Sequence, residues 1–153
     1  MLDPIVKSID VPCDQETAFE VFVTDMGQWW PLDKRSMSMV HHRQPPKGLQ
    51  VNPQAGGKIV EIGHDGTAYH WGTFTTFQPF DFVAMDFHMG LPPENASLVE
   101  VRFESLDPEN TRVTLVQSNW EAFGDMAEMM YRGYGSGWVL IFEQGYASAC
   151  ARR

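Results

Sequence analysis

The stretch that decides the fold is FGDMAEMMYRGYGSGWVLIFEQGYASAC, residues 123–150. Its large apolar residues follow one another at steps of three or four positions, which is the spacing of one face of a helix. The residues on this face are Phe123, Met126, Met130, Tyr134, Trp138, Ile141, Phe142 and Tyr146. The pattern predicts a long amphipathic helix whose apolar face must be buried against another element.

The preceding residues, 49–120, have the pattern of short antiparallel strands. Asp65-Gly66 supplies the positive φ of a tight hairpin turn. Residues 98–105 alternate between apolar and polar side chains, as a half-buried strand does. A helix that follows such a meander buries its face by lying across the sheet. If the sheet curves around the helix, the space between them becomes a pocket, and we expect the function there.

The first third of the chain adds one strand and short helical segments. Residues 5–11 alternate as a first strand, and Asp14 is a suitable N-cap for a short helix that ends near Gly27. Pro31 disfavours helical backbone at Trp30, which we place at a corner or on a broken second helix. Residues 33–48 are the least regular part and the best candidate for a mobile flap.

Composition and charge limit the classes of function. The chain has 153 residues, which suits one domain spanning 1–153, and 43% of them are apolar, enough for a real core. The net charge of −9 argues against nucleic-acid binding, which needs a basic face for the phosphates. There is no apolar run of the length that a membrane span requires, and residues 1–10 have no signal-peptide core. We expect a cytoplasmic protein.

The sequence offers little sign of a metal or cofactor. Cys13 and Cys150 are far apart in the sequence, and we expect both to be free thiols in a reducing compartment. The adjacent side chains of His41 and His42 diverge, so that one ion seldom binds both, and no His-x-x-x-His or Cys-x-x-Cys pattern occurs. Gly56-Gly57 has no following helix and does not predict a phosphate site. We therefore expect no metal and no cofactor.

Several segments together resemble the START-like (SRPBCC, Bet v 1-type helix-grip) superfamily. The similarity is greatest to the branch named after the C-terminal domain of the activator of the Hsp90 ATPase. It runs from about residue 4 to 146, and no single motif carries it alone. The segments are Ala18–Phe22, Trp29–Leu32, Gly56–Glu61, Asp65–Thr67 with Trp71-Gly72, Val99–Phe103, Thr111–Leu115 and Gly137-Trp138. The resemblance implies an α+β fold in which a curved antiparallel sheet grips the long C-terminal helix, with one or two short helices after the first strand.

The resemblance also implies an internal cavity, but it does not name a reaction. The residues that we place around this cavity are Trp30, Trp71, Phe87, Gln117, Met130, Tyr134 and Trp138. Tyr134 and Trp138 lie one helical turn apart, and each carries a polar group on an apolar body. Gln117 shares a strand face with Val113 and Leu115, so an inward amide would contact a ligand or join a structural network.

Three functions remain open. The first is a binding module for a small apolar or aromatic molecule. The second is an enzyme of the cyclase or hydrolase kind, for which Glu61, His70 and Tyr134 are the only suitable titratable groups. No catalytic constellation is identifiable, which favours the binding module. The third is a co-chaperone of an Hsp90-type ATPase, although the separate N-terminal domain of that co-chaperone does not fit in this chain. Sheet-edge pairing could also give a homodimer.

Two further expectations concern charged side chains on strands. A solvated position on the sheet is favoured for Glu61 over a buried one in the cavity. Asp86 and His88 alternate with the apolar row of their strand, and we expect both to be solvated.

Overall fold

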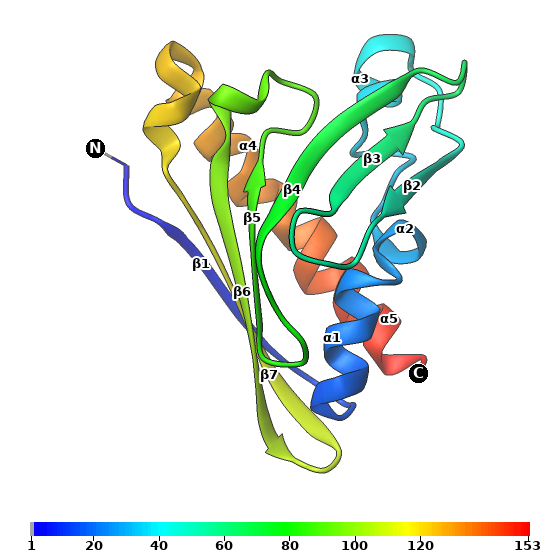
Figure 1. Ribbon diagram of the computed structural model, residues 1–153, viewed down its shortest axis with the longest axis vertical. Helices are drawn as coiled ribbons and strands as arrows, with labels where there is room; N and C mark the ends of the chain where they lie inside the picture. Colours follow the sequence, from blue (N-terminus) through cyan, green and yellow to red (C-terminus); the bar gives the residue numbers. More distant parts are fainter. Residues whose placement is uncertain (1) are drawn as a thin grey trace.

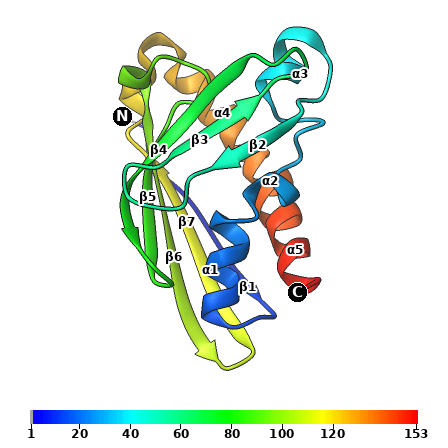
Figure 2. The same ribbon diagram turned by 45° about the vertical axis from the view of Figure 1, so that its right-hand side comes forward.

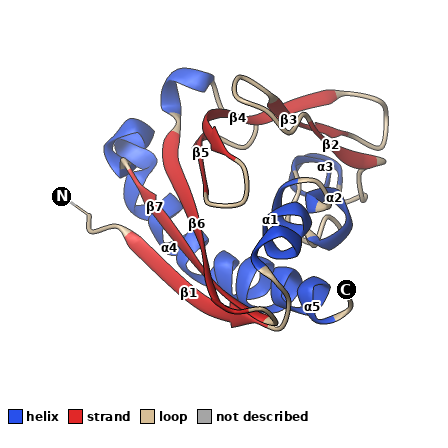
Figure 3. Cartoon of the chain, turned by 60° about the horizontal axis from the view of Figure 1, so that its bottom comes forward, coloured by secondary structure: helices blue, strands red, loops and turns tan. Residues whose placement is uncertain are grey.

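The computed structural model describes residues 2–153 and places seven strands in one antiparallel sheet that curls around the C-terminal helix (Figures 1 and 3). The order of the strands across the sheet is β1-β7-β6-β5-β4-β3-β2. The strands are β1 (Ile5–Val11), β2 (Gly48–Val51), β3 (Lys58–Ile62), β4 (Ala68–Gln78), β5 (Phe82–Phe87), β6 (Ser97–Asp107) and β7 (Asn110–Ser118). The α+β helix-grip class expected from the sequence is confirmed.

The helices fall into two groups. Three short ones follow the first strand: α1 (Gln15–Val23), α2 (Met26–Trp29) and α3 (Met37–His42). The others are η1 (Pro93–Asn95), η2 (Trp120–Met126), α4 (Ala127–Trp138), η3 (Val139–Tyr146) and α5 (Ala147–Ala151). The last three run on as one long helix, with α1 beside its end (Figure 2). Within residues 2–153, none of these helices has the length and apolarity that crossing a membrane requires.

The predicted helix over residues 123–150 differs from the observed one in two respects. Gly124 has a φ of 59° and breaks the segment, so the 3-10 turn η2 precedes the regular helix, which begins at Ala127. Further on, η3 is a π-helical segment, wider than an α-helix. Its residues Ile141, Phe142 and Tyr146 are all buried, so the apolar face continues through the wider turns.

The interior between sheet and helix is filled by aromatic side chains. Trp30, Trp71, Phe87, Tyr134 and Trp138 form a group that we call the aromatic cluster. The ring of Trp30 lies 4.9 Å from that of Trp71 and 5.9 Å from that of Trp138, measured between centroids. Phe87 lies 6.0 Å from Tyr134 on the helix. Edge-to-face and tilted contacts at such distances stabilise beyond the area that they bury, so this cluster joins sheet and helix.

A buried chain of hydrogen bonds connects the same elements. The indole Nε1 of Trp138 donates to Oε1 of Gln117 at 2.8 Å. Nε2 of Gln117 donates to Oγ of Ser97 at 3.0 Å, and this hydroxyl donates to the backbone oxygen of Phe87 at 2.8 Å. Gln117 shares its inward face with Val113 and Leu115, as expected. Its amide thus serves a structural network, one of the two roles that the sequence left open.

Glu61 is fully buried, so the solvated position expected from the sequence is wrong. Its carboxylate accepts hydrogen bonds from the backbone N–H groups of Met37 and Ser38, both at 2.8 Å. It also accepts from Nε1 of Trp71 at 3.0 Å. A carboxylate so placed satisfies the free N–H groups at the start of α3. The sheet therefore holds α3, which lies in the segment 33–48 that the sequence marked as irregular.

The Gln117 network yields a prediction for stability. Gln117→Leu removes the acceptor for Trp138 and the donor for Ser97, leaving both groups buried without a partner. We expect the free energy of unfolding in urea to fall by about 1–3 kcal/mol. Gln144→Leu, at an exposed position on η3, should change it by less than about 0.5 kcal/mol. Equal effects of the two substitutions would contradict the structural role of Gln117.

The Glu61 anchor yields a second prediction. In Glu61→Gln one acceptor oxygen becomes an amide that faces a donor, so the start of α3 loses a hydrogen bond. Hydrogen exchange at the amides of Met37 and Ser38 should accelerate, and stability should fall by about 1–3 kcal/mol. The amides of β6 and β7 should keep their relative protection. Unchanged exchange at α3 would show that Glu61 does not hold it.

Candidate ligand pocket

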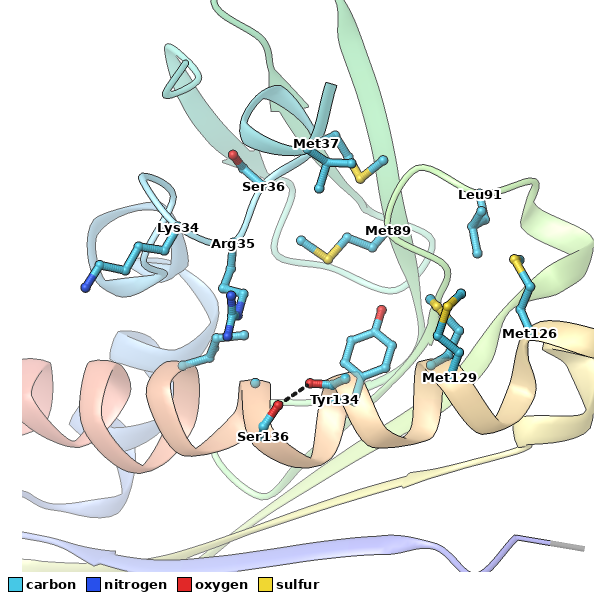
Figure 4. A pocket seen from close by; sticks show the side chains of 15 residues that line it. Lys34, Arg35, Ser36, Met37, Met89, Leu91, Met126, Met129, Tyr134 and Ser136 are labelled. Carbon is cyan, nitrogen blue, oxygen red and sulfur yellow. Dashed lines mark hydrogen bonds between the residues drawn. The ribbon is translucent and has the colours of Figure 1, made fainter. Parts of the chain in front are cut away.

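A cavity of about 530 Å³ lies where α3, the loop after β5 and helix α4 meet (Figure 4). Its walls are mostly apolar, and five of the nine methionines of the chain line it. These are Met37, Met89, Met126, Met129 and Met130. Methionine is flexible and polarisable, and it adapts its shape to varied partners. The volume is within the range of sites for small organic molecules.

Part of this lining is open to solvent. The exposed fractions are 64% for Met129, 38% for Met126 and 71% for Val40. Single exposed apolar side chains are common on protein surfaces, whereas apolar side chains gathered around a hollow indicate a binding site. The exposed rim thus leads from solvent into the pocket.

Tyr134 supplies the polar group at the floor of the pocket. Its ring stacks on Trp138 in the aromatic cluster, at 5.9 Å between centroids. Its hydroxyl points away from the helix into the pocket (Figure 4). Burial raises the pKa of Tyr134 well above its ordinary value. The hydroxyl therefore stays protonated at neutral pH and can donate a hydrogen bond to a bound molecule.

Two cationic side chains border the pocket at the side of α3. Lys34 and Arg35 are exposed, and within residues 2–153 neither forms an ion pair with a carboxylate. The Arg35 side chain lies over the helix at Gly137, where a Cβ would be 3.9 Å from its Nε. Its backbone oxygen accepts a hydrogen bond from Nε1 of Trp30 at 2.8 Å. Arg35 is thus attached to the aromatic cluster through its backbone.

His88 holds the loop that forms the opposite wall, and its expected solvation is wrong because the side chain is fully buried. Its Nδ1–H donates to the backbone oxygen of Leu91 at 2.7 Å, and Met89 and Leu91 both line the pocket. Burial lowers the pKa of His88, so the neutral imidazole is favoured. Asp86 is half-buried and accepts from the backbone N–H of Thr73 at 2.7 Å.

The structure divides the seven residues predicted for the cavity into two sets. Met130 and Tyr134 line the pocket. The others lie beneath it, each at most 5% exposed: Trp30, Trp71, Phe87, Gln117 and Trp138. These five fill the space between sheet and helix that the sequence suggested as a cavity. Their contact with a ligand remains a prediction, and the pocket opens at one end of that filled space.

The residue pattern of the sequence gives no sign of the pocket residues in α3 and in the segment just before it. Met37 and Arg35 lie in the irregular segment 33–48, and nothing in their spacing indicates that they face the last helix. The clustering of methionines at positions 126, 129 and 130 was visible in the sequence. It did not show whether they pack in the core or border a pocket.

Of the three titratable groups considered for an enzyme, only Tyr134 lines the pocket. Glu61 is occupied by the start of α3 and by Trp71. Nε2 of His70 is bonded to the backbone oxygen of Gly72 at 2.9 Å and lies 3.1 Å from Oγ1 of Thr73. No aspartate, glutamate or histidine is among the described residues that line the pocket.

Solved structures with this fold cover almost the whole chain. An anthrahydroquino-γ-pyrone synthase, Txn09, is 26% identical with a TM-score of 0.65, over 99% of this chain and 96% of that one. The self-sacrificing resistance protein CalC from Micromonospora echinospora is 22% identical with a TM-score of 0.73, over 97% and 94%. An Hsp90 activator from Plasmodium falciparum is 18% identical with a TM-score of 0.57, over 87% and 88%. The last two show the fold alone.

A comparison with curated proteins finds no match. The family model described as Activator of Hsp90 ATPase homolog 1-like protein matches residues 12–144, which is most of the chain and includes strands β2 to β7 and helices α3 and α4. This match confirms the resemblance noted in the sequence. The chain belongs to the family of Activator of Hsp90 ATPase homolog 1-like proteins.

Proposed function

We propose that this protein binds a small, largely apolar aromatic molecule in the pocket between α3 and α4. The observation that carries the proposal is the set of five methionines around a cavity of about 530 Å³, with Tyr134 of the aromatic cluster at its floor. Such a lining gives little directional bonding and favours an apolar ligand, and methionine sulfur also makes favourable contacts with aromatic rings. The cytoplasm remains the expected compartment.

The few polar groups favour a ligand that carries oxygen at two places. The Tyr134 hydroxyl can donate to a carbonyl or phenol oxygen at the floor of the pocket. Arg35 and Lys34 at the rim suit a carboxylate or phenolate, because a cation near a partly desolvated anion stabilises it. The proposed ligand is therefore an oxygenated polycyclic aromatic molecule with an acidic group near the rim.

An enzyme with a related substrate is the second candidate, since the structure that is 26% identical is named as a synthase. Tyr134 is the group placed to assist chemistry; its raised pKa keeps the hydroxyl protonated as a hydrogen-bond donor but makes it a weak general acid. Proton abstraction would need a base that the described lining does not contain. Binding without turnover is therefore better supported. A co-chaperone role is supported only by the name of the family.

Gly133→Leu tests the pocket without disturbing the fold. Gly133 is an exposed residue of α4 that lines the pocket, and a Cβ there would have no atom within 4 Å. Leucine favours helix over glycine by up to about 1 kcal/mol, so stability should hold or rise while the side chain occupies part of the cavity. We expect affinity for anthraquinone-2-carboxylate, followed by tryptophan fluorescence, to fall more than about tenfold, or 1.4 kcal/mol.

Ser148→Leu is the matched control, because Ser148 is exposed on α5 and does not line the pocket. It should leave the affinity unchanged. If the wild-type protein binds the probe and Gly133→Leu binds it equally well, the site lies elsewhere. If the wild-type protein binds neither this probe nor neutral anthraquinone, the proposed ligand class is wrong.

A further inference from the structure

A second cluster of side chains lies at the opposite end of α3 from its Glu61 anchor. His42 is the last residue of α3, and His64 and Asp65 belong to the turn between β3 and β4. Each of the three offers one ligand atom, and these atoms all lie within 4.8 Å of one another. The rings of His42 and His64 are 4.7 Å apart between centroids. Residues 22 positions apart in the sequence thus meet at one point.

The side chains of His41 and His42 point in different directions, because consecutive residues of a helix lie on different faces. His41 turns to Tyr69 and stacks on its ring at 5.9 Å, with 22° between the planes. His42 turns to the hairpin. One histidine of the pair is therefore available to the cluster, although the two cannot bind one ion together.

His64 is fixed in place but not fully satisfied. Its backbone N–H donates to Oγ of Ser38 in α3 at 3.2 Å. Its side-chain Nδ1 is buried and has no hydrogen-bond partner among the described residues. A buried polar atom without a partner costs about 1–3 kcal/mol. An ion or water bound to Nδ1 itself would remove that cost.

We propose that His42, His64 and Asp65 form a binding site for Zn²⁺. Two imidazoles and a carboxylate are a donor set that zinc accepts, with water as the fourth ligand. Tetrahedral zinc holds its ligand atoms about 3.3 Å apart, given bonds of about 2.0–2.1 Å. The side chains of His42 and Asp65 are exposed and can rotate to close the remaining distance.

The site would connect ion binding to the ligand pocket. Zinc would link the end of α3 to the β3–β4 turn, while Glu61 already links its start to β3 and β4. Met37 and Val40 of α3 line the pocket. A bound ion would therefore make this wall more rigid, at a site that has no contact with the pocket ligand.

The test is titration of the full-length, chelator-treated and dialysed protein with Zn²⁺ alone, by calorimetry near pH 7. We expect one ion per chain. His42→Gln should lower the affinity more than about tenfold, since even the residues that hydrogen-bond to a metal's ligands contribute about that much. Asp65→Asn can keep its turn hydrogen bond to the backbone N–H of Thr67 and should also weaken binding. His41→Gln is the matched control and should bind as the wild type does.

Two further readouts separate this site from other modes of binding. Binding should weaken in acid, because a protonated imidazole nitrogen cannot bind the ion. Zinc should slow hydrogen exchange in α3 of the wild type but not of His42→Gln. The proposal is overturned if the wild type takes up no zinc, or if His42→Gln binds it as tightly as the wild type. Binding that persists in His42→Gln and is lost on alkylation of Cys13 and Cys150 would assign it to the thiols instead.

Discussion

The burial of one continuous apolar face of the C-terminal helix is the constraint on which the rest of the structure depends. This face begins with Tyr134 and Trp138 and runs through the π-helical segment to Tyr146, whose hydroxyl donates to the backbone oxygen of Ala18 in α1 at 2.7 Å. Burying a large apolar side chain contributes about 1.5–3 kcal/mol. The seven-stranded sheet covers this face by curling around the helix (Figure 3).

Filling that interior with aromatic rings determines where function can reside. Trp30, Trp71, Phe87 and Trp138 leave the space between sheet and helix occupied, so the cavity opens only where α3 and the Met89–Leu91 loop meet α4. Tyr134 at the floor of the pocket packs on this cluster, and five flexible methionines contribute to the walls. Each wall is held in part by one buried titratable side chain, Glu61 for α3 and His88 for the loop. The specificity of the pocket for its ligand would then depend on the positions in which α3 and the loop are held.

Much of the fold could be read from the sequence because its signals are local. The period of the last helix, the Asp65-Gly66 turn and the alternation of residues 98–105 each depend on near neighbours. The side of β4 that faces the core could not be read in this way. Trp71 is an extra residue opposite β3, between His70, which pairs with Val60, and Gly72, which pairs with Ile59. Such a bulge shifts the alternation, which is why Trp71 and Phe74 are both buried.

The site was less predictable because it depends on contacts between distant segments. Met130 and Tyr134 were found through the helical period. Met37 and Arg35 reach the pocket only because Glu61, 24 residues from Met37, is turned inward and holds the start of α3. A glutamate on a strand usually faces solvent. The burial of Glu61 is explained only by its three hydrogen-bond donors, which are the backbone N–H groups of Met37 and Ser38 and Nε1 of Trp71. The proximity of His42 to His64 could not be predicted for the same reason, because the two residues are distant in the sequence.

The most direct measurement is a titration of methyl-¹³C-methionine protein with anthraquinone-2-carboxylate, followed by NMR. The methyl signals of Met37, Met89, Met126, Met129 and Met130 should shift together and saturate with one ligand. Those of Met26 and Met85, which are at most 2% exposed in the core away from the pocket, should stay in place. Shifts confined to Met26 and Met85, or no shifts at saturating probe, would contradict a ligand site between α3 and α4.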